Sequence, residues 1–168
     1  MKTLIIFLFF NLIGLNVFCQ TGEKFKYQYS PETGRLCFIT LKAENPVPEN
    51  AKYIEGRPAG NFAYDSLLHT YYHIVMKSIH PEKKKKLIEQ TKFIIFLHFK
   101  YSISGKVLTI GMSLPTVSLN ILEEEDLYIL YNNLRNLEVD MTKIEMNYPP
   151  YWINGTEAYW EYACSIPI

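Results

Sequence analysis

The sequence predicts an α+β domain in which an antiparallel sheet carries two main helices on one face. Two patterns lead to this prediction: apolar residues alternate with period two in several short segments and recur at helical spacing in two longer ones. The third observation is size, because 168 residues with 48% hydrophobic side chains suffice for one packed core and are too apolar for wholesale disorder. We therefore expect one domain behind a short leader.

The leader, residues 1–19, has the three-part layout of a secretory signal peptide. Lys2 precedes an apolar run, and the segment ends at a small residue, Cys19. The run is about a dozen residues long, whereas a helix that spans a bilayer needs ~20. We expect cleavage before Gln20, a mature domain over 20–168 without a membrane span, and a periplasmic or secreted location.

Cys19 also permits a lipid anchor, which we regard as the less favoured alternative. Lipidated bacterial precursors have a leucine three positions before the cysteine and a small residue just before it, but Asn16 and Phe18 stand there. The ending Phe18-Cys19-Gln20 instead resembles signal peptides of Bacteroidetes, which often end in an aromatic residue, a small residue and a glutamine.

The mature chain begins with a predicted β-hairpin. Aromatic residues alternate with polar ones over 24–30, a Pro-Glu-Thr-Gly turn follows at 31–34, and alternation resumes over 36–41. After a loop with two prolines, Asp65 or Ser66 can cap the first helix. Its apolar face comprises Leu68, Tyr71, Tyr72, Val75 and Ile79.

Pro81 ends this helix or opens a second short one. The segment 93–101 reads FIIFLHFKY and is the most strand-like part of the chain. Because its first half is apolar on both faces, it is typical of a central strand. Ser104-Gly105 offers a turn to a partner strand over 107–112, which completes a second hairpin.

The last third of the chain predicts a helix and two strands. Asn120 is the expected cap of the helix, with Glu123 completing a capping box. A short strand is expected over 137–141. A final strand over 159–166 alternates so that Trp160, Tyr162, Cys164 and Ile166 share one inward face.

Charge and motifs exclude several classes of function. The 17 basic and 17 acidic residues balance, which argues against a protein that coats nucleic acid. The lysine run 83–86 predicts a solvated helix face, and the acidic run 123–126 suits a helix N-terminus. No hydrolase elbow, phosphate loop, dinucleotide fingerprint or HExxH occurs. We therefore expect no catalytic activity and no cofactor.

Few side chains are candidates for chemistry. His69 and His73 have a spacing that can bind zinc, but without an obvious third ligand we expect two solvated helix residues and no metal. His98 is expected to be a hydrogen-bonded structural histidine. Cys37 and Cys164 form either one disulfide, which an exported chain permits, or two buried thiols. No local signature makes Cys37 a nucleophile.

An excess of aromatic residues near the C-terminus provides the surface candidates. Tyr148, Tyr151 and Trp152 lie in a loop with two prolines, where exposed rings could stack on sugars or anchor a partner. Packing of these rings over the sheet is the competing interpretation.

From residue 66 the predicted order is helix, strand, Gly-turn, strand, helix, strand. The segment FIIFLHFKYSISGKVLTIGMSL, with Ser104-Gly105-Lys106-Val107 at its turn, resembles the central hairpin of the TonB C-terminal domain family, and the apolar positions of 127–134 resemble the helix that follows it. The resemblance covers about half of the mature chain. It implies an αββαβ fold used for protein contact. TonB proteins keep a membrane helix and a proline-rich linker, whereas here a cleavable-looking leader stands in their place, so we expect a stand-alone exported relative.

These observations lead to a non-catalytic exported protein that acts as a protein–protein interaction module at the cell envelope. An exposed edge strand or the loop of Tyr148, Tyr151 and Trp152 would contact an envelope protein partner. The alternative is a secreted glycan-binding module that uses the same three aromatic residues. A hydrolase built on Cys37 and a histidine is the third hypothesis, and the oligomeric state stays open.

Overall fold

The computed structural model describes residues 19–168 except 32–33, 45–46, 48–49, 91–92 and 148–157. Residues 1–18, which make up nearly all of the expected signal peptide, therefore lie outside the described residues. The same holds for Tyr148, Tyr151 and Trp152. Among the residues that are described, no helix combines the length and the apolar character needed to cross a membrane.

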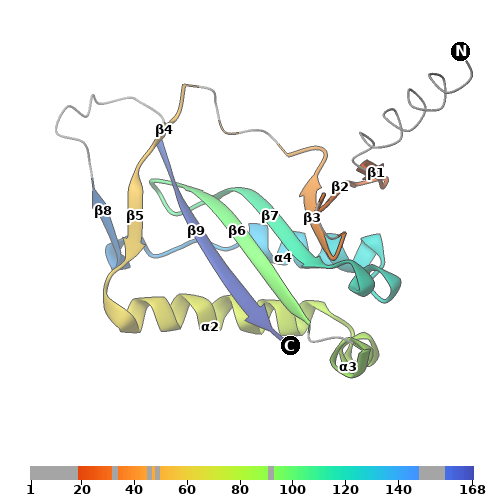
Figure 1. Cartoon of the computed structure of the whole chain (residues 1–168). Coiled ribbons are helices and arrows are strands. Elements are labelled where there is room, and N and C mark those ends of the chain that lie inside the picture. Colours follow the sequence, from red (N-terminus) through yellow and green to blue (C-terminus); the bar gives the residue numbers. More distant parts are fainter. Residues whose placement is uncertain (1–18, 32–33, 45–46, 48–49, 91–92, 148–157) are drawn as a thin grey trace, which may run out of the picture.

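The described part of the chain forms a seven-stranded sheet with the strand order β1-β2-β3-β7-β6-β9-β4 (Figure 1). Its strands are β1 (Cys19–Thr21), β2 (Phe25–Tyr29), β3 (Leu36–Leu41), β4 (Lys52–Tyr53), β6 (Ile94–Ser102), β7 (Val107–Pro115) and β9 (Ala158–Pro167). Neighbouring strands are antiparallel, except that β4 runs parallel to β9. A two-stranded ribbon pairs β5 (Glu55–Pro58) with β8 (Ile144–Asn147).

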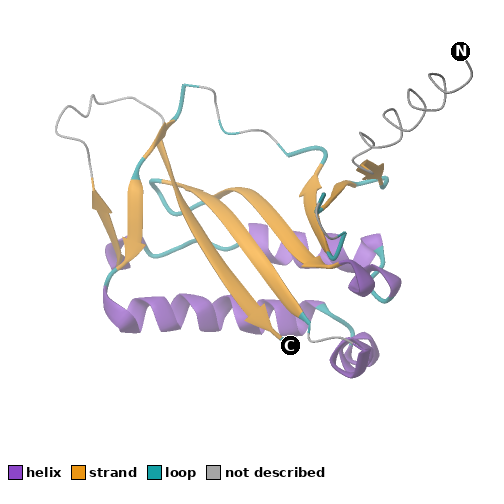
Figure 2. Cartoon of the chain, viewed as in Figure 1, coloured by secondary structure: helices purple, strands orange, loops and turns teal. Residues whose placement is uncertain are grey.

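The helices are α2 (Gly60–Ser78), α3 (Pro81–Gln90) and α4 (Glu124–Arg135), with short 3₁₀ turns η1 (Thr116–Asn120) and η2 (Met141–Lys143). Helices α2 and α4 run along the same side of the sheet, as Figure 2 shows. The predicted α+β class is therefore confirmed. The N-terminal hairpin β2–β3 and the hairpin β6–β7 are both present. The predicted order of helix, strand, strand, helix and strand corresponds to α2, β6, β7, α4 and β9.

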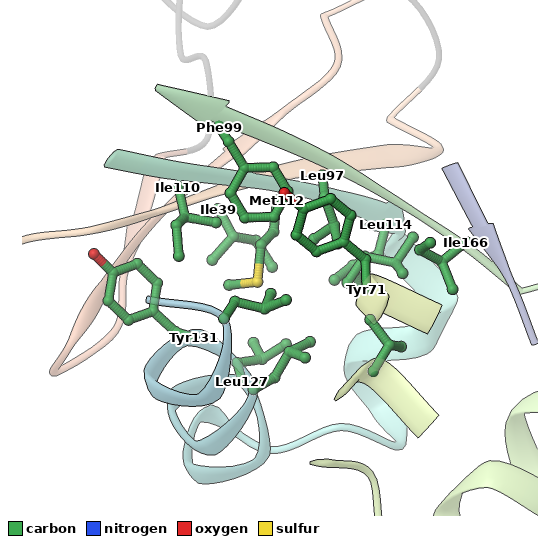
Figure 3. Packing of buried hydrophobic residues seen from close by; sticks show 14 of the residues in the cluster. Ile39, Tyr71, Leu97, Phe99, Ile110, Met112, Leu114, Leu127, Tyr131 and Ile166 are labelled. Carbon is green, nitrogen blue, oxygen red and sulfur yellow. The ribbon is translucent and has the colours of Figure 1, made fainter. Parts of the chain in front are cut away.

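One hydrophobic core lies between the sheet and the helices (Figure 3). Alternate residues of the strands point into it, because side chains of a strand alternate between its two faces. Fully or almost fully buried side chains from the sheet include Phe25, Ile39, Leu97, Phe99, Ile110, Met112, Leu114, Trp160 and Ile166. Tyr71 and Val75 of α2 and Leu127, Leu130 and Tyr131 of α4 meet them from the helical layer. The inward face predicted for β9 is confirmed.

The first helix begins earlier than predicted. Its N-cap is Ala59, which makes no side-chain cap bond, and Asp65 and Ser66 lie within the helix. Gly60 has φ of 65°, a left-handed value that glycine adopts without steric cost, so the chain turns into the helix there. Backbone geometry thus replaces the expected side-chain cap.

The predicted cap of α4 is also wrong. Residues up to Asn120 belong to η1, and Glu123 is the N-cap instead. Its backbone N–H donates to the Asp126 carboxylate at 2.8 Å, and its own carboxylate accepts from the backbone at Asp126. The capping box is therefore present, three residues later than predicted and built from two acidic residues.

The strand expected over 137–141 does not form. In this segment the described pairing is one isolated bridge between Lys106 and Glu138. Asp140 then caps η2 by accepting from the Thr142 backbone N–H at 3.0 Å, which commits the chain to a 3₁₀ turn.

Two carboxylates attach α4 to the sheet. Glu124 accepts backbone N–H bonds from Glu23, Lys24 and Phe25 at 3.0, 2.6 and 2.9 Å. Burial opposes ionisation of Glu124, but these bonds outweigh it and lower its pKa. The second carboxylate, Glu44, belongs to the loop after β3.

The Glu44 carboxylate lies between β7 and α4. It accepts from the Ile110 backbone N–H at 2.9 Å, from the Tyr131 hydroxyl, and from the Arg135 guanidinium at 3.3 Å. Its side chain is only 9% exposed, so the three donors satisfy a carboxylate that would otherwise be costly to bury.

Candidate protein-interaction surface

Strand β9 leaves most of one edge of the sheet unpaired in the described part of the chain. Its inner side pairs with β6 over nine consecutive residue pairs, from Ile94↔Pro167 to Ser102↔Tyr159. Among the described residues, its outer side pairs with β4 at Ala158 and Tyr159 alone. We call the rest of this outer side, residues 160–167, the β9 edge.

The register determines which backbone groups of the β9 edge face outward. The Ile168 N–H donates inward to the Phe93 carbonyl at 3.1 Å, whereas the Tyr159 carbonyl accepts from outside, from the Ile54 N–H at 2.8 Å. Backbone groups of successive residues alternate in an antiparallel pair. The N–H and C=O groups that face outward therefore belong to Glu161, Ala163 and Ser165. At the end of the edge, Pro167 has no N–H.

Within the part of the chain that the structure describes, few of the common devices that block a strand edge occur along β9. Natural edges are protected by lysines, prolines, bulges or covering loops. The β9 edge contains no lysine, its one proline is its last residue, and its pairing with β6 is free of the register shift that β6–β7 shows between Lys100 and Tyr101. The result is a long, regular edge.

An aromatic stack packs beneath this edge. Trp160, which is fully buried, stacks on Tyr101 with ring centroids 4.8 Å apart. Tyr101 in turn stacks on Phe99, and Phe99 on Tyr71 of α2, at 5.5 and 4.7 Å. The hydroxyls of Tyr71 and Tyr101 hydrogen-bond to each other inside the core. These contacts hold β9 to β6 and to α2.

A groove runs beside the β9 edge. It has a volume of about 630 Å³, and its lining comprises Gly56, Arg57, Pro58, Gly60, Glu145, Glu161, Tyr162 and Ala163. The ribbon β5–β8 thus forms one wall and β9 the other. Gly56 permits their close approach, since a Cβ at this position would lie 3.2 Å from the Cβ of Trp160. Arg57 and Glu145 pair on the ribbon wall at 2.9 Å.

The sheet face opposite the helices carries exposed apolar side chains. Phe38 is 44% and Phe96 45% exposed, and both align in register with Ser113 between them. Ile94, on the same face, is 36% exposed. The central position predicted for 93–101 is correct, since β6 lies between β7 and β9, and the outward residues of β6 meet no further layer within the described residues.

The two cysteines do not form the disulfide that the sequence permitted. Cys37 on β3 and Cys164 on β9 are buried free thiols, and the strands β7 and β6 lie between them. Burial raises the pKa of Cys37 to about 11 and that of Cys164 to about 12. Both thiols therefore stay protonated at neutral pH, which makes Cys37 a poor nucleophile.

The histidines are distributed over two surfaces. His69 and His73 are exposed on α2, with their Nε2 atoms 3.1 Å apart. His98 lies in the central strand β6 and is half-exposed on the open sheet face, where its Nε2 lies 3.5 Å from the Glu161 carboxylate. Within the described residues, no group of three or more His, Cys, Asp or Glu side chains is placed to hold a metal ion.

The lysine run over 83–86 is less solvated than predicted. Lys83 pairs with Asp126 at 2.6 Å and Lys84 donates to the Met76 carbonyl at 2.8 Å. Lys85 and Lys86 fit the prediction, because both are exposed, and Lys85 makes a loose ion pair with Glu89 at 3.9 Å. Part of the run therefore fixes α3 to its neighbours.

Comparison with solved structures finds a chain of similar fold. It is a DUF5043 family protein from Bacteroides uniformis ATCC 8492, which is 9% identical, with a TM-score of 0.50 and coverage of 87% of each chain. At this identity the likeness supports the α+β fold alone. Comparisons with protein-family models and with curated proteins find no match.

Two features of this surface escaped the sequence analysis. One wall of the groove is formed by β5 and β8, whose residues show no strand pattern and whose pairing joins segments about 90 positions apart. The exposure of Phe38 and Phe96 also gave no local signal, because an apolar residue on a strand looks the same whether its face is covered or open.

Proposed function

We propose that the chain is a non-catalytic exported protein that acts as a protein–protein interaction module at the cell envelope. Its partner adds an extended segment to the β9 edge as a further strand. The observation that carries this proposal is the row of outward backbone groups at Glu161, Ala163 and Ser165. In strand addition such groups provide affinity, and side-chain pockets beside the edge provide specificity.

The surroundings of the edge support an extended peptide as the occupant. Every second residue of an added strand would point toward the groove, which offers Gly56, Pro58 and Gly60 as a low wall and the ion pair of Arg57 and Glu145 as polar contacts. The other residues of that strand would continue the open face, next to Ser165 and the exposed Phe96. An edge held by an aromatic stack needs little ordering on binding.

Export and the TonB resemblance belong to the same proposal. The leader over 1–19 indicates the envelope as the site of action, with the lipid anchor at Cys19 as the alternative. The resemblance to TonB C-terminal domains adds a reason for protein contact, because it implies the same use of the fold.

Proline substitution at the edge tests this proposal. Ala163→Pro removes one outward N–H and leaves the hydrogen bonds from β9 to β6 in place, since the amide at this position faces away from β6. Capture of the envelope partner should weaken by at least about tenfold, which corresponds to ~1.4 kcal/mol. Ala163→Ser, which alters the side chain and keeps the N–H, is the matched control and should bind normally.

Circular dichroism of both variants establishes that they are folded. If the folded proline variant captures the partner as well as the wild type does, strand addition at β9 is wrong.

The glycan-binding alternative depends on Tyr148, Tyr151 and Trp152, which lie outside the described residues. It predicts binding on a glycan array that alanine at any of the three weakens. An array without signal above background would remove it.

A further inference from the structure

Two imidazole rings meet on the solvent side of α2. His69 and His73 are one helical turn apart and both exposed, while Tyr71 and Val75 of the same helix are buried against the sheet. Residues at this spacing are neighbours on a helix surface. Their Nε2 atoms are 3.1 Å apart and their ring centroids 4.2 Å, with the planes inclined at 76°.

This separation fits two ligands of one metal ion. Zinc–nitrogen bonds measure about 2.0–2.1 Å, and at that length two nitrogens 3.1 Å apart subtend about 100° at the ion. The angle lies between the octahedral and the tetrahedral values. The rings also converge, because a linear N–H···N bond would hold their centroids about 5.4 Å apart rather than 4.2 Å.

Binding requires little rearrangement. Without an ion, the two Nε2 atoms are within hydrogen-bond distance, so one ring carries its proton there. Moving that proton to Nδ1 frees both Nε2 lone pairs, and a small rotation of the rings then directs both at one ion, since bonds of about 2.05 Å at that angle of about 100° place the ring centroids about 4.8 Å apart rather than 4.2 Å. A site that is already assembled avoids the entropy cost of ordering two side chains.

We propose that His69 and His73 form a bidentate site for a divalent transition-metal ion, with water in the remaining coordination positions. Imidazole nitrogen suits zinc, copper and nickel, whereas magnesium and calcium require oxygen ligands. Affinity rises from nickel to copper and is lower for zinc than for copper. The site is independent of the β9 edge and of the proposed function.

Calorimetric titration of the tag-free mature chain with ZnCl₂, NiCl₂ or CuCl₂ tests the site. A tag must be absent because polyhistidine binds the same ions. We expect one equivalent of ion per chain. His69→Ala and His73→Ala should each weaken binding by about tenfold or more, since loss of a ligand costs at least as much as loss of a residue that orients one.

His80→Ala is the matched control, because His80 is also exposed but stands outside the pair. It should bind like the wild type. Saturating ion should raise the thermal midpoint of the wild type and of His80→Ala and leave that of the double variant His69→Ala/His73→Ala unchanged. Equal affinity in wild type and double variant, or no binding by the wild type, would overturn the proposal.

Discussion

The hydroxyl pair of Tyr71 and Tyr101 allows a sharp test of how β9 is supported. Both side chains are fully buried, and each hydroxyl is the hydrogen-bond partner of the other. Tyr71→Phe leaves the Tyr101 hydroxyl buried without this partner, and Tyr101→Phe does the same to Tyr71. An unpaired buried polar group costs about 1–3 kcal/mol.

The double variant removes both hydroxyls and leaves the rings in place. Replacing two hydrogen-bonded groups by apolar groups of the same shape is nearly neutral. We therefore expect each single variant to lose about 2 kcal/mol of unfolding free energy and the double variant to lose less than about 1 kcal/mol. The coupling between the two positions is then about 3 kcal/mol, since the two single losses add to more than the double loss.

Urea denaturation measures all four proteins. With a slope of about 2 kcal/mol/M, each single variant should unfold about 1 M earlier than the wild type, and the double variant close to it. If the stability losses of the two single variants simply add, so that the double variant is the least stable protein, the two hydroxyls are not each other's hydrogen-bond partner in the core.

Three further predictions concern stability at high pH, the attachment of α4 to the sheet and the reactivity of the two cysteines. Burial raises the pKa of Tyr27 from 10.0 to about 12 and that of Cys164 from 9.0 to about 12, so the unfolded chain releases these protons first. The contribution of these two protonated groups to the free energy of unfolding should therefore be fully present below pH 9 and be lost as the pH rises toward 12. Denaturation in a pH series measures this contribution, and a flat profile would contradict the burial of these groups. Glu44→Ala should cost about 2–4 kcal/mol because it leaves the Ile110 N–H and the proton of the Tyr131 hydroxyl without an acceptor, whereas Glu44→Gln should cost about 1 kcal/mol because an amide oxygen still accepts. Equal losses of unfolding free energy in the two variants would contradict a stabilising role for these hydrogen bonds. Cys37 and Cys164 should react with a thiol reagent only after unfolding, because both are buried free thiols; labelling of the native chain followed by mass spectrometry decides this, and rapid labelling would argue against it.

Much of the fold follows from local patterns in the sequence. Alternation over 159–166 predicted the buried face of β9 correctly, because the period of a strand is a property of its own residues. The hairpin β6–β7 was predictable for a similar reason, since a Gly-containing turn joins two strands that are adjacent in the chain. The two helix starts were less predictable: a glycine turn at Gly60 and an acidic cap at Glu123 took the places of the expected polar caps.

The candidate surface depends on contacts between distant segments, which local patterns do not encode. Nothing near Ala163 in the sequence indicates that β9 stands at an edge, because its neighbours β6 and β4 come from elsewhere in the chain. The described partners of Glu44 likewise lie more than 60 positions away, so its role between β7 and α4 gave no local signal. The single metal-like spacing, His69 and His73, was visible in the sequence, but the convergence of its nitrogens was not.

Residue-resolved hydrogen exchange of the β9 backbone tests the central claim most directly. In the isolated chain the amides of Ala163 and Ser165 should exchange fast, because they face outward, while the amide of Cys164 should be protected by its bond to β6. Binding of the envelope partner should slow Ala163 and Ser165 and leave Cys164 unchanged. Protection of Ala163 and Ser165 in the isolated chain, or fast exchange that persists in the complex, would contradict strand addition at this edge.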